Sequence, residues 1–219
     1  MRALVQKLSA VQEAALITTI FAGWFIFVAM SFVFAGFPRA DAAGFSAADA
    51  ISLVVFETVL FCIAALVLRW RGWQLQHFLF SVSWRDVLGA VALLLVTMFV
   101  DFVLWTAVGS RLDDGSILEE IVPDSGVSFG VALLFSLVNG TFEEFFLCRY
   151  LIERFHTSGA AFAVTLSALI RMLYHTYQGP YGTLSILAFG LMLGWYYWRT
   201  RSLGAVVLTH IVADLAALT

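Results

Sequence analysis

Seven long apolar segments, separated by short polar stretches, limit most strongly what this chain can fold into. A helix needs about 20 apolar residues to cross a hydrocarbon core of about 30 Å. The segments are too long for the strands of a membrane barrel, and they lack the alternation of a lipid-facing strand. They run over Ala14–Gly36, Ala48–Leu68, Asp86–Gly109, Val127–Phe155, Gly159–Gln178, Tyr181–Trp198 and Leu203–Leu218. We therefore expect an all-α, polytopic transmembrane bundle of about seven spans.

Composition excludes the main alternatives to a membrane protein. Hydrophobic residues make up 62% of the chain and charged residues 12%, against about 45–50% and about 25% in soluble domains. A net charge of −3 without a basic cluster leaves no footprint for nucleic acid. No linker or repeat divides the chain, so residues 1–219 are predicted to form a single integral membrane domain with the lipid bilayer as its surroundings.

The distribution of Lys and Arg predicts the orientation of this domain. If the first segment is a retained anchor and the N-terminus is cytoplasmic, only Arg39 and Arg111 fall outside. The inside then holds Arg2, Lys7, Arg69, Arg71, Arg85, Arg154, Arg199 and Arg201. This bias follows the positive-inside rule and indicates a multi-pass protein with a cytoplasmic N-terminus. An acidic loop, Arg111–Asp124, is expected on the opposite side.

Ionisable residues within the apolar segments are few, and they gather on three segments. Such groups cost several kcal/mol in a bilayer, on the order of 2.5–3.5 by insertion scales, so they normally pair and mark function. They are Glu57, Asp101, Glu143, Glu144, Arg149, Arg171, His175, His210 and Asp214. The fourth, fifth and seventh segments each carry a cluster near mid-span, which indicates a buried polar cavity between the later helices.

Spacing places several of these groups on common helix faces. His210 and Asp214 are four residues apart, as are Arg171 and His175, so each pair projects from one side of its helix. Two carboxylates so close to each other need a proton or a cation between them. A carboxylate beside a histidine can activate water as a general base, and histidine donors can stabilise an oxyanion. These residue types suit hydrolysis of an acyl bond.

Three motifs within residues 141–214 resemble those of the CAAX protease and bacteriocin-processing (Abi) family of intramembrane endopeptidases, which includes the type II CAAX prenyl endopeptidases. Members show Glu-Glu-x-x-x-Arg, Phe-x-x-x-His and His-x-x-x-Asn/Asp on successive late helices. The corresponding stretches here are Glu143–Leu151, Arg171–His175 and His210–Asp214. The resemblance implies endopeptidase cleavage of a membrane-associated peptide or protein, and the family's name suggests a prenylated C-terminus on that substrate.

The resemblance also implies roles for the matched residues. Glu143 would activate water, with Glu144 as its companion, while His175 would orient the water or the substrate. His210 with Asp214 would form the oxyanion-stabilising side. Zinc held by Glu143, His175 and His210 is an alternative that uses the same residues, and the preferred interpretation requires no cofactor.

This sequence departs from the family pattern at two positions. The arginine of the first motif falls on Cys148, and Arg149 lies about 140° around an α-helix from Glu144. Arg171 replaces the phenylalanine that opens the second motif. We hypothesise that the counter-charge has moved between helices and that Arg171 reaches Glu144, which adds Arg171 to the predicted site; a decayed site is the alternative.

A non-catalytic membrane protein is the rival interpretation. It would be a scaffold with a degenerate protease fold, or a proton-coupled transporter whose carboxylates and histidines relay protons. A relay would require Glu57 and Asp101 along its path. In a protease these two residues would instead bond across helices or contact substrate.

Overall fold

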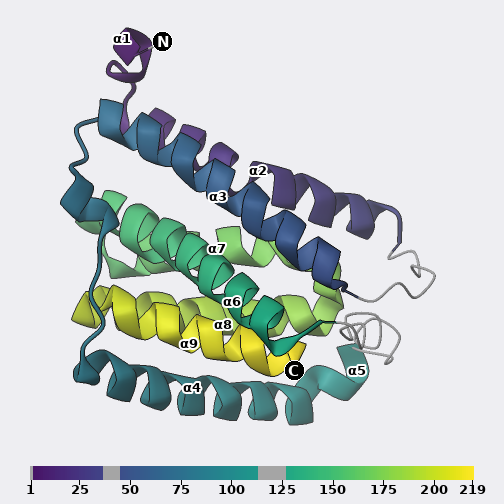
Figure 1. Cartoon of the computed structure of the whole chain (residues 1–219). Coiled ribbons are helices and arrows are strands. Elements are labelled where there is room, and N and C mark those ends of the chain that lie inside the picture. The colour runs from purple at the N-terminus through teal and green to yellow at the C-terminus, as the bar shows by residue number, and fades with distance from the viewer. Residues whose placement is uncertain (1, 37–44, 113–126) are drawn as a thin grey trace.

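The computed structural model describes residues 2–36, 45–112 and 127–219, and these ranges contain helices and no strands (Figure 1). Within them, seven helices of at least 15 residues coincide with the seven apolar segments. They are α2 (Ala10–Phe34), α3 (Ala47–Trp70), α4 (Trp84–Leu104), α6 (Phe129–Glu144), α7 (Ala160–Tyr174), α8 (Gly179–Thr200) and α9 (Leu203–Leu218). The predicted all-α fold class is confirmed.

Short helical elements extend or connect the long ones. Two of them are π-helical and continue α4 and α6 without a break. The short elements are α1 (Arg2–Val5), η1 (Leu75–Phe78), the π-helices η2 (Trp105–Gly109) and η4 (Phe145–Ile152), α5 (Ser110–Leu112), η5 (His156–Ser158) and η6 (Thr176–Gln178). Most of the acidic loop predicted at Arg111–Asp124 lies outside the described residues.

Four helices are long and apolar enough to cross a membrane by length and composition, counting only the described residues. They are Ala10–Phe34, Ala47–Trp70, Trp84–Gly109 and Phe129–Ile152. The helices α7 and α9 are apolar but shorter. A bilayer offers the backbone no hydrogen-bond partners, and a helix satisfies these groups internally. The chain is therefore an integral membrane protein.

Serine side chains mark where five of the described helices begin. Each hydroxyl accepts a hydrogen bond from a backbone N–H of the first turn, which has no partner within the helix. In α2, α3 and α4 the side chain of the third helical residue accepts a hydrogen bond from the backbone N–H of the cap residue, completing a capping box. The caps are Ser9, Ser46, Ser83, Ser128 and Ser202. The serine caps thus set where these apolar helices begin.

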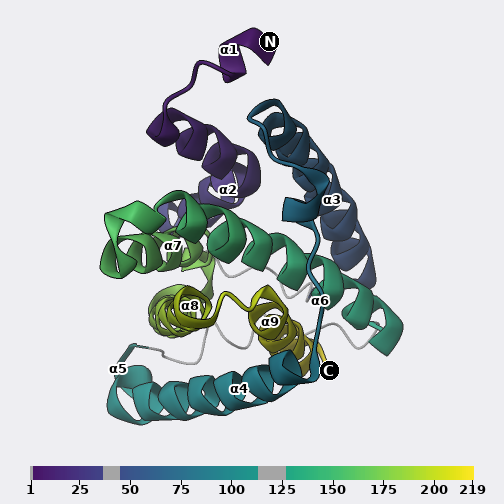
Figure 2. The same cartoon turned by 90° about the vertical axis from the view of Figure 1, so that its left-hand side faces the viewer.

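The helices form layers, with the motif-bearing helices in the middle. Viewed along the bundle, α2 and α3 lie on one side and α4 on the other, while α6, α7, α8 and α9 lie between them (Figure 2). The main contacts join α7 to α8, α6 to α9, α3 to α6 and α4 to α9. The predicted clusters on the fourth, fifth and seventh segments therefore lie in the protein interior.

A buried ionic contact ties three helix ends together at one end of the bundle. Glu13, near the start of α2, is buried and pairs with Arg71 just beyond the end of α3. Arg154 Nε lies 3.3 Å from Glu13 Oε1, and the hydroxyl of Tyr150 donates to the same oxygen at 3.2 Å. Arg71 and Arg154, which the positive-inside rule assigns to the same side of the membrane, thus lie close together.

Close packing of α7 against α8 depends on a glycine. A Cβ at Gly190 would lie 3.2 Å from Ala168 Cα and 3.2 Å from Arg171 Cδ. Both distances are tighter than ordinary van der Waals contact. The absence of a side chain at Gly190 therefore lets the two helices approach and leaves room for the Arg171 side chain.

We expect Gly190→Val to destabilise the protein, because the added carbons would force α7 and α8 apart. Overpacking of this kind costs about 1–3 kcal/mol. Thermal unfolding of purified protein in detergent should show a lower Tm. Gly130→Val is the matched control, since a Cβ there would meet nothing within 4 Å beyond its chain neighbours and its own helix backbone. An equal loss of Tm in both variants would contradict this account.

Candidate active site

A single guanidinium connects the two adjacent carboxylates that end α6. Arg171, in the last turn of α7, is only 2% exposed. Its NH2 lies 2.5 Å from Glu144 Oε1, and its NH1 lies 3.4 Å from Glu143 Oε2. The structure therefore places the Arg171 guanidinium against Glu144 across two helices, in the arrangement hypothesised from the sequence.

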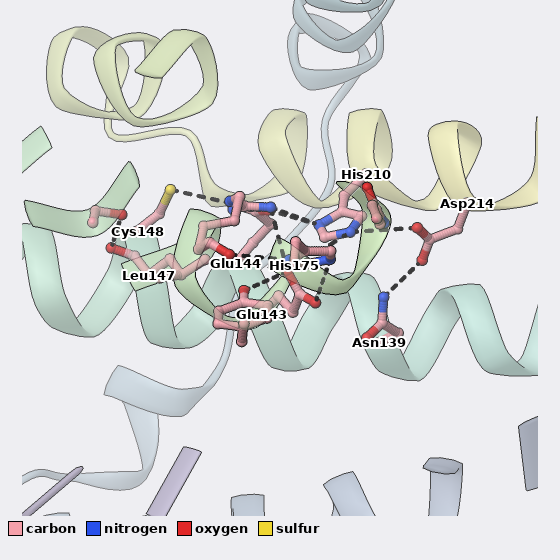
Figure 3. A network of polar contacts seen from close by, with 12 residues as sticks. Asn139, Glu143, Glu144, Leu147, Cys148, His175, His210 and Asp214 are labelled. Atoms are coloured by element: carbon pink, nitrogen blue, oxygen red, sulfur yellow. Dashed lines mark hydrogen bonds and ion pairs between the residues drawn. The ribbon is translucent and has the colours of Figure 1, made fainter. Parts of the chain in front are cut away.

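Glu144 is completely buried and surrounded by donors (Figure 3). Besides Arg171, its Oε1 lies 2.7 Å from His210 Nδ1, and the Cys148 thiol donates to Oε2 at 3.2 Å. Cys148 occupies the position of the family's motif arginine, and it keeps contact with Glu144 although η4 is wound as a π-helix. Glu144 is held by three partners and has no exposed surface.

Arg149 takes no part in this cluster. It is partly exposed on η4 and hydrogen-bonds to Tyr197 of α8. The Tyr197 hydroxyl also donates to Glu153 Oε1 at 3.0 Å. The displaced motif arginine therefore contributes to packing of η4 against α8. It does not pair with Glu144, as the angular argument from the sequence predicts.

Glu143 is held more loosely than Glu144. Its shortest contact is with the Tyr174 hydroxyl, which donates to Oε2 at 2.6 Å. His175 Nε2 lies 3.9 Å from Oε1 and His210 Nε2 lies 4.0 Å from Oε2. Both separations are too long for a direct hydrogen bond.

His175 reaches Glu143 because α7 ends early. The fifth apolar segment extends to Gln178, yet α7 stops at Tyr174 and a short 3-10 turn follows. His175 lies at that helix end, and its Nδ1 is 3.1 Å from the carbonyl oxygen of Arg171. A ring that donates from Nδ1 to a carbonyl keeps a lone pair on Nε2, the nitrogen that faces Glu143.

His210 and Asp214 act as a pair on α9. His210 Nε2 lies 3.4 Å from Asp214 Oδ1, while Asn139 Nδ2 of α6 donates to Asp214 Oδ2 at 2.9 Å (Figure 3). Carboxylate oxygens thus face both ring nitrogens of His210, an arrangement that favours an imidazolium donating from both nitrogens. The Phe189 ring packs edge-on to His210 and beneath the Arg171 guanidinium.

Two pockets meet at these residues. The larger, which we call the aromatic pocket, has a volume of about 400 Å³ and is walled by side chains of α2, α3, α6 and α9, with Glu143 among them. The second, of about 340 Å³, lies between α4, α8 and α9 and is lined by Arg171 and His210. His175 and Asp214 line both. The sequence did not assign α2 or α3 to the site.

All six predicted site residues lie in one connected cluster, but the sequence analysis missed several of their partners. Tyr174 and Asn139 were overlooked, and Cys148 was seen only as a departure from the motif. Asn139 lies four residues before Glu143, so the two side chains project from the same face of the helix. This spacing could have identified Asn139 from the sequence. Asp101 bonds across helices as expected, accepting hydrogen bonds from Tyr181 at 2.9 Å and Ser185 at 2.5 Å.

The arrangement of donors does not fit zinc. Within the described ranges, no group of three His, Cys, Asp or Glu side chains is placed to hold a metal ion. Donors around tetrahedral zinc lie about 3.4 Å apart, given zinc–ligand distances of about 2.1 Å. The Glu143 oxygens are 3.9 and 4.0 Å from the histidine nitrogens, and the Arg171 cation lies beside them. The mechanism that we propose for this site therefore uses no metal.

Comparison with known families agrees with the motifs. Residues 125–216 match the family model described as Type II CAAX prenyl endopeptidase Rce1-like. The matched region contains all three motifs, so the resemblance predicted from Glu143, His175, His210 and their neighbours is confirmed. The chain is thus an all-helical integral membrane protein that is similar to a family of proteases. No curated protein and no solved structure matches it.

We expect Arg171→Ala to be severely destabilising and Arg149→Ala to be mild. Removing one partner of a buried ion pair costs about 3–5 kcal/mol, because the remaining charge stays buried. Loss of Arg149 leaves Tyr197 its bond to Glu153 and should cost no more than about 1 kcal/mol, as exposed pairs do. Thermal unfolding in detergent would measure both variants, and the opposite ranking would overturn the assigned counter-charge.

Proposed function

We propose that this chain is a CAAX-protease-like intramembrane endopeptidase that hydrolyses a peptide bond in a membrane-associated peptide or protein. The family match supports protease activity, and the polar cluster contains groups suited to activating water and stabilising an oxyanion. The prenylated C-terminus suggested by the family description is the substrate that we propose for it. The reacting bond would lie where the two pockets meet, beside His175 and Asp214.

The unequal surroundings of the two glutamates carry this proposal. Glu144 is enclosed by Arg171, His210 and Cys148 and lines neither pocket. Glu143 lines the aromatic pocket, and its Oε1 faces His175 across 3.9 Å. A general base must reach its proton within hydrogen-bond distance or through one water. Glu143 is therefore the base in our proposal, and Glu144 fixes the positions of Arg171 and His210.

The proposed reaction begins with a water between Glu143 Oε1 and His175 Nε2, which are close enough for one water to contact both. Glu143 takes its proton, and the hydroxide oxygen bonds to the substrate carbonyl carbon. The His210 Nε2–H, whose contact with Asp214 is long at 3.4 Å, is shared with the substrate carbonyl oxygen and stabilises the oxyanion. Breakage of the C–N bond follows as Glu143 returns the proton to the leaving amine, giving a carboxylic acid and an amine.

We further propose that all seven long helices form one membrane domain over residues 1–219, with the N-terminus cytoplasmic. Alternate helix ends lie at the same end of the bundle (Figure 1), and Glu13, Arg71 and Arg154 meet at one of these ends. Cations gathered at one end follow the positive-inside bias. The shorter helix α9 is largely buried among its neighbours and so needs less apolar length than a lipid-facing span, whereas α7 presents Phe162 and Leu169 at the surface.

We expect Glu143→Gln and His210→Ala to abolish cleavage of a quenched fluorescent peptide with a prenylated C-terminus by the purified protein. Loss of a general base lowers kcat by about 10²–10⁴-fold, and loss of an oxyanion donor by about 10²–10³-fold. A chelator should leave wild-type activity unchanged, because the proposed mechanism uses no metal.

Glu153→Gln is the matched control for the glutamate substitution. Glu153 pairs with Arg201 at 2.9 Å, outside both pockets, so this variant should cleave like the wild type. Cleavage that a chelator abolishes would refute the metal-free mechanism. If no peptide is cleaved in a Glu143-dependent way, the chain is a scaffold or a transporter and the proposed protease activity is wrong.

A further inference from the structure

A second buried carboxyl group lines the aromatic pocket without a partner. Glu57, in the middle of α3, is 2% exposed, and its Oε2 has no hydrogen-bond partner among the described residues. An unpaired carboxylate in an apolar environment costs several kcal/mol, so such a group is normally paired or hydrogen-bonded. Glu57 must therefore either carry a proton or bind a partner that the described residues do not supply.

The charges around the pocket identify the kind of partner that is missing. Glu57, Glu143 and Asp214 all line the pocket. Arg171 and Tyr174 contact Glu143, and His210 and Asn139 contact Asp214. Of the three carboxyl groups, Glu57 alone is left without a compensating donor. A ligand that completes the pocket would therefore bring a positive charge.

The walls of the pocket fit an alkyl chain that ends in such a charge. Six phenylalanines, among them Phe25, Phe142 and Phe146, line it together with Glu57. Aromatic and apolar walls pack against methylene groups, and ring faces attract cations. The volume of about 400 Å³ falls within the range of about 300–1,000 Å³ typical of small-ligand sites. Lysine and arginine side chains combine an apolar stem with a terminal cation.

We propose that Glu57 determines specificity by pairing with a basic side chain of the substrate, close to the bond that is cleaved. This inference rests on the proposed protease function, because it assigns the aromatic pocket to a substrate residue. The contrast with Asp101 supports it. Asp101 accepts hydrogen bonds from Tyr181 and Ser185 and so serves packing between α4 and α8, whereas Glu57 has no such neighbour.

The experiment compares two sets of quenched fluorescent peptides cleaved by the full-length protein in detergent. One set carries a single lysine at each of the three positions on either side of the cleaved bond. The other carries norleucine there, which keeps the alkyl stem and lacks the charge. We expect at least one lysine position to raise kcat/KM by about tenfold or more over norleucine, since buried charge pairs contribute this much or more.

Glu57→Gln should reduce that preference to less than about twofold and leave cleavage of the norleucine peptides in place, because the amide keeps the shape and removes the charge. Its Tm should not fall, since the substitution removes a buried unpaired charge. The matched control is Glu153→Gln, which changes a carboxyl group outside both pockets and should keep the lysine preference.

Each of the remaining outcomes would overturn the proposed role of Glu57. Equal cleavage of lysine and norleucine peptides by the wild type, or an unchanged preference in Glu57→Gln, would overturn the role of Glu57 and leave the protease function standing. Loss of all cleavage in Glu57→Gln with an unchanged Tm would make Glu57 part of a proton path, which also overturns it. If the wild type cleaves no peptide, the proposed function fails and this inference fails with it.

Discussion

The buried guanidinium of Arg171 is the interaction on which the site depends. Three helices bring ionisable groups to the same place: α6 supplies Glu143 and Glu144, α7 supplies Arg171, and α9 supplies His210. Each group would be costly alone in an apolar interior, and together they offset much of that cost. The packing of α6, α7 and α9 is thus coupled to charge pairing, and Gly190 of α8 leaves the space that Arg171 occupies.

Arg171 also makes two neighbouring glutamates chemically different. Its NH2 approaches Glu144 to 2.5 Å and its NH1 stays 3.4 Å from Glu143. His210 adds its own contact to Glu144, so that carboxylate is surrounded, whereas Glu143 faces a pocket. Adjacent residues on a helix project about 100° apart. That angle places Glu144 against the cation and Glu143 toward the aromatic pocket. In our mechanism Glu144 accordingly positions its neighbours, and Glu143 acts as the base.

The sequence predicted the class of fold and the members of the polar cluster, because both follow from the small number of charged residues. Long uncharged runs define the helices, and the few ionisable groups inside them have to meet. It could not predict where α7 ends, since the apolar run continues past Tyr174 to Gln178. Nor could it predict the π-helix after Glu144 or the contribution of α2 and α3 to the pocket. These features arise from tertiary packing, which a residue pattern does not record.

The two departures from the family motifs are best understood as one change. The first motif has cysteine at 148 where its arginine is expected, and the second begins with Arg171 instead of phenylalanine. Arginines at both positions would place two cations against Glu144, whose partners are already complete. Arginine at neither position would leave that buried carboxylate without a guanidinium and with His210 as its remaining charged partner. A small thiol donor at 148 and an arginine on the neighbouring helix satisfy both conditions. What the site requires is a cation at that point in space, and more than one helix can supply it.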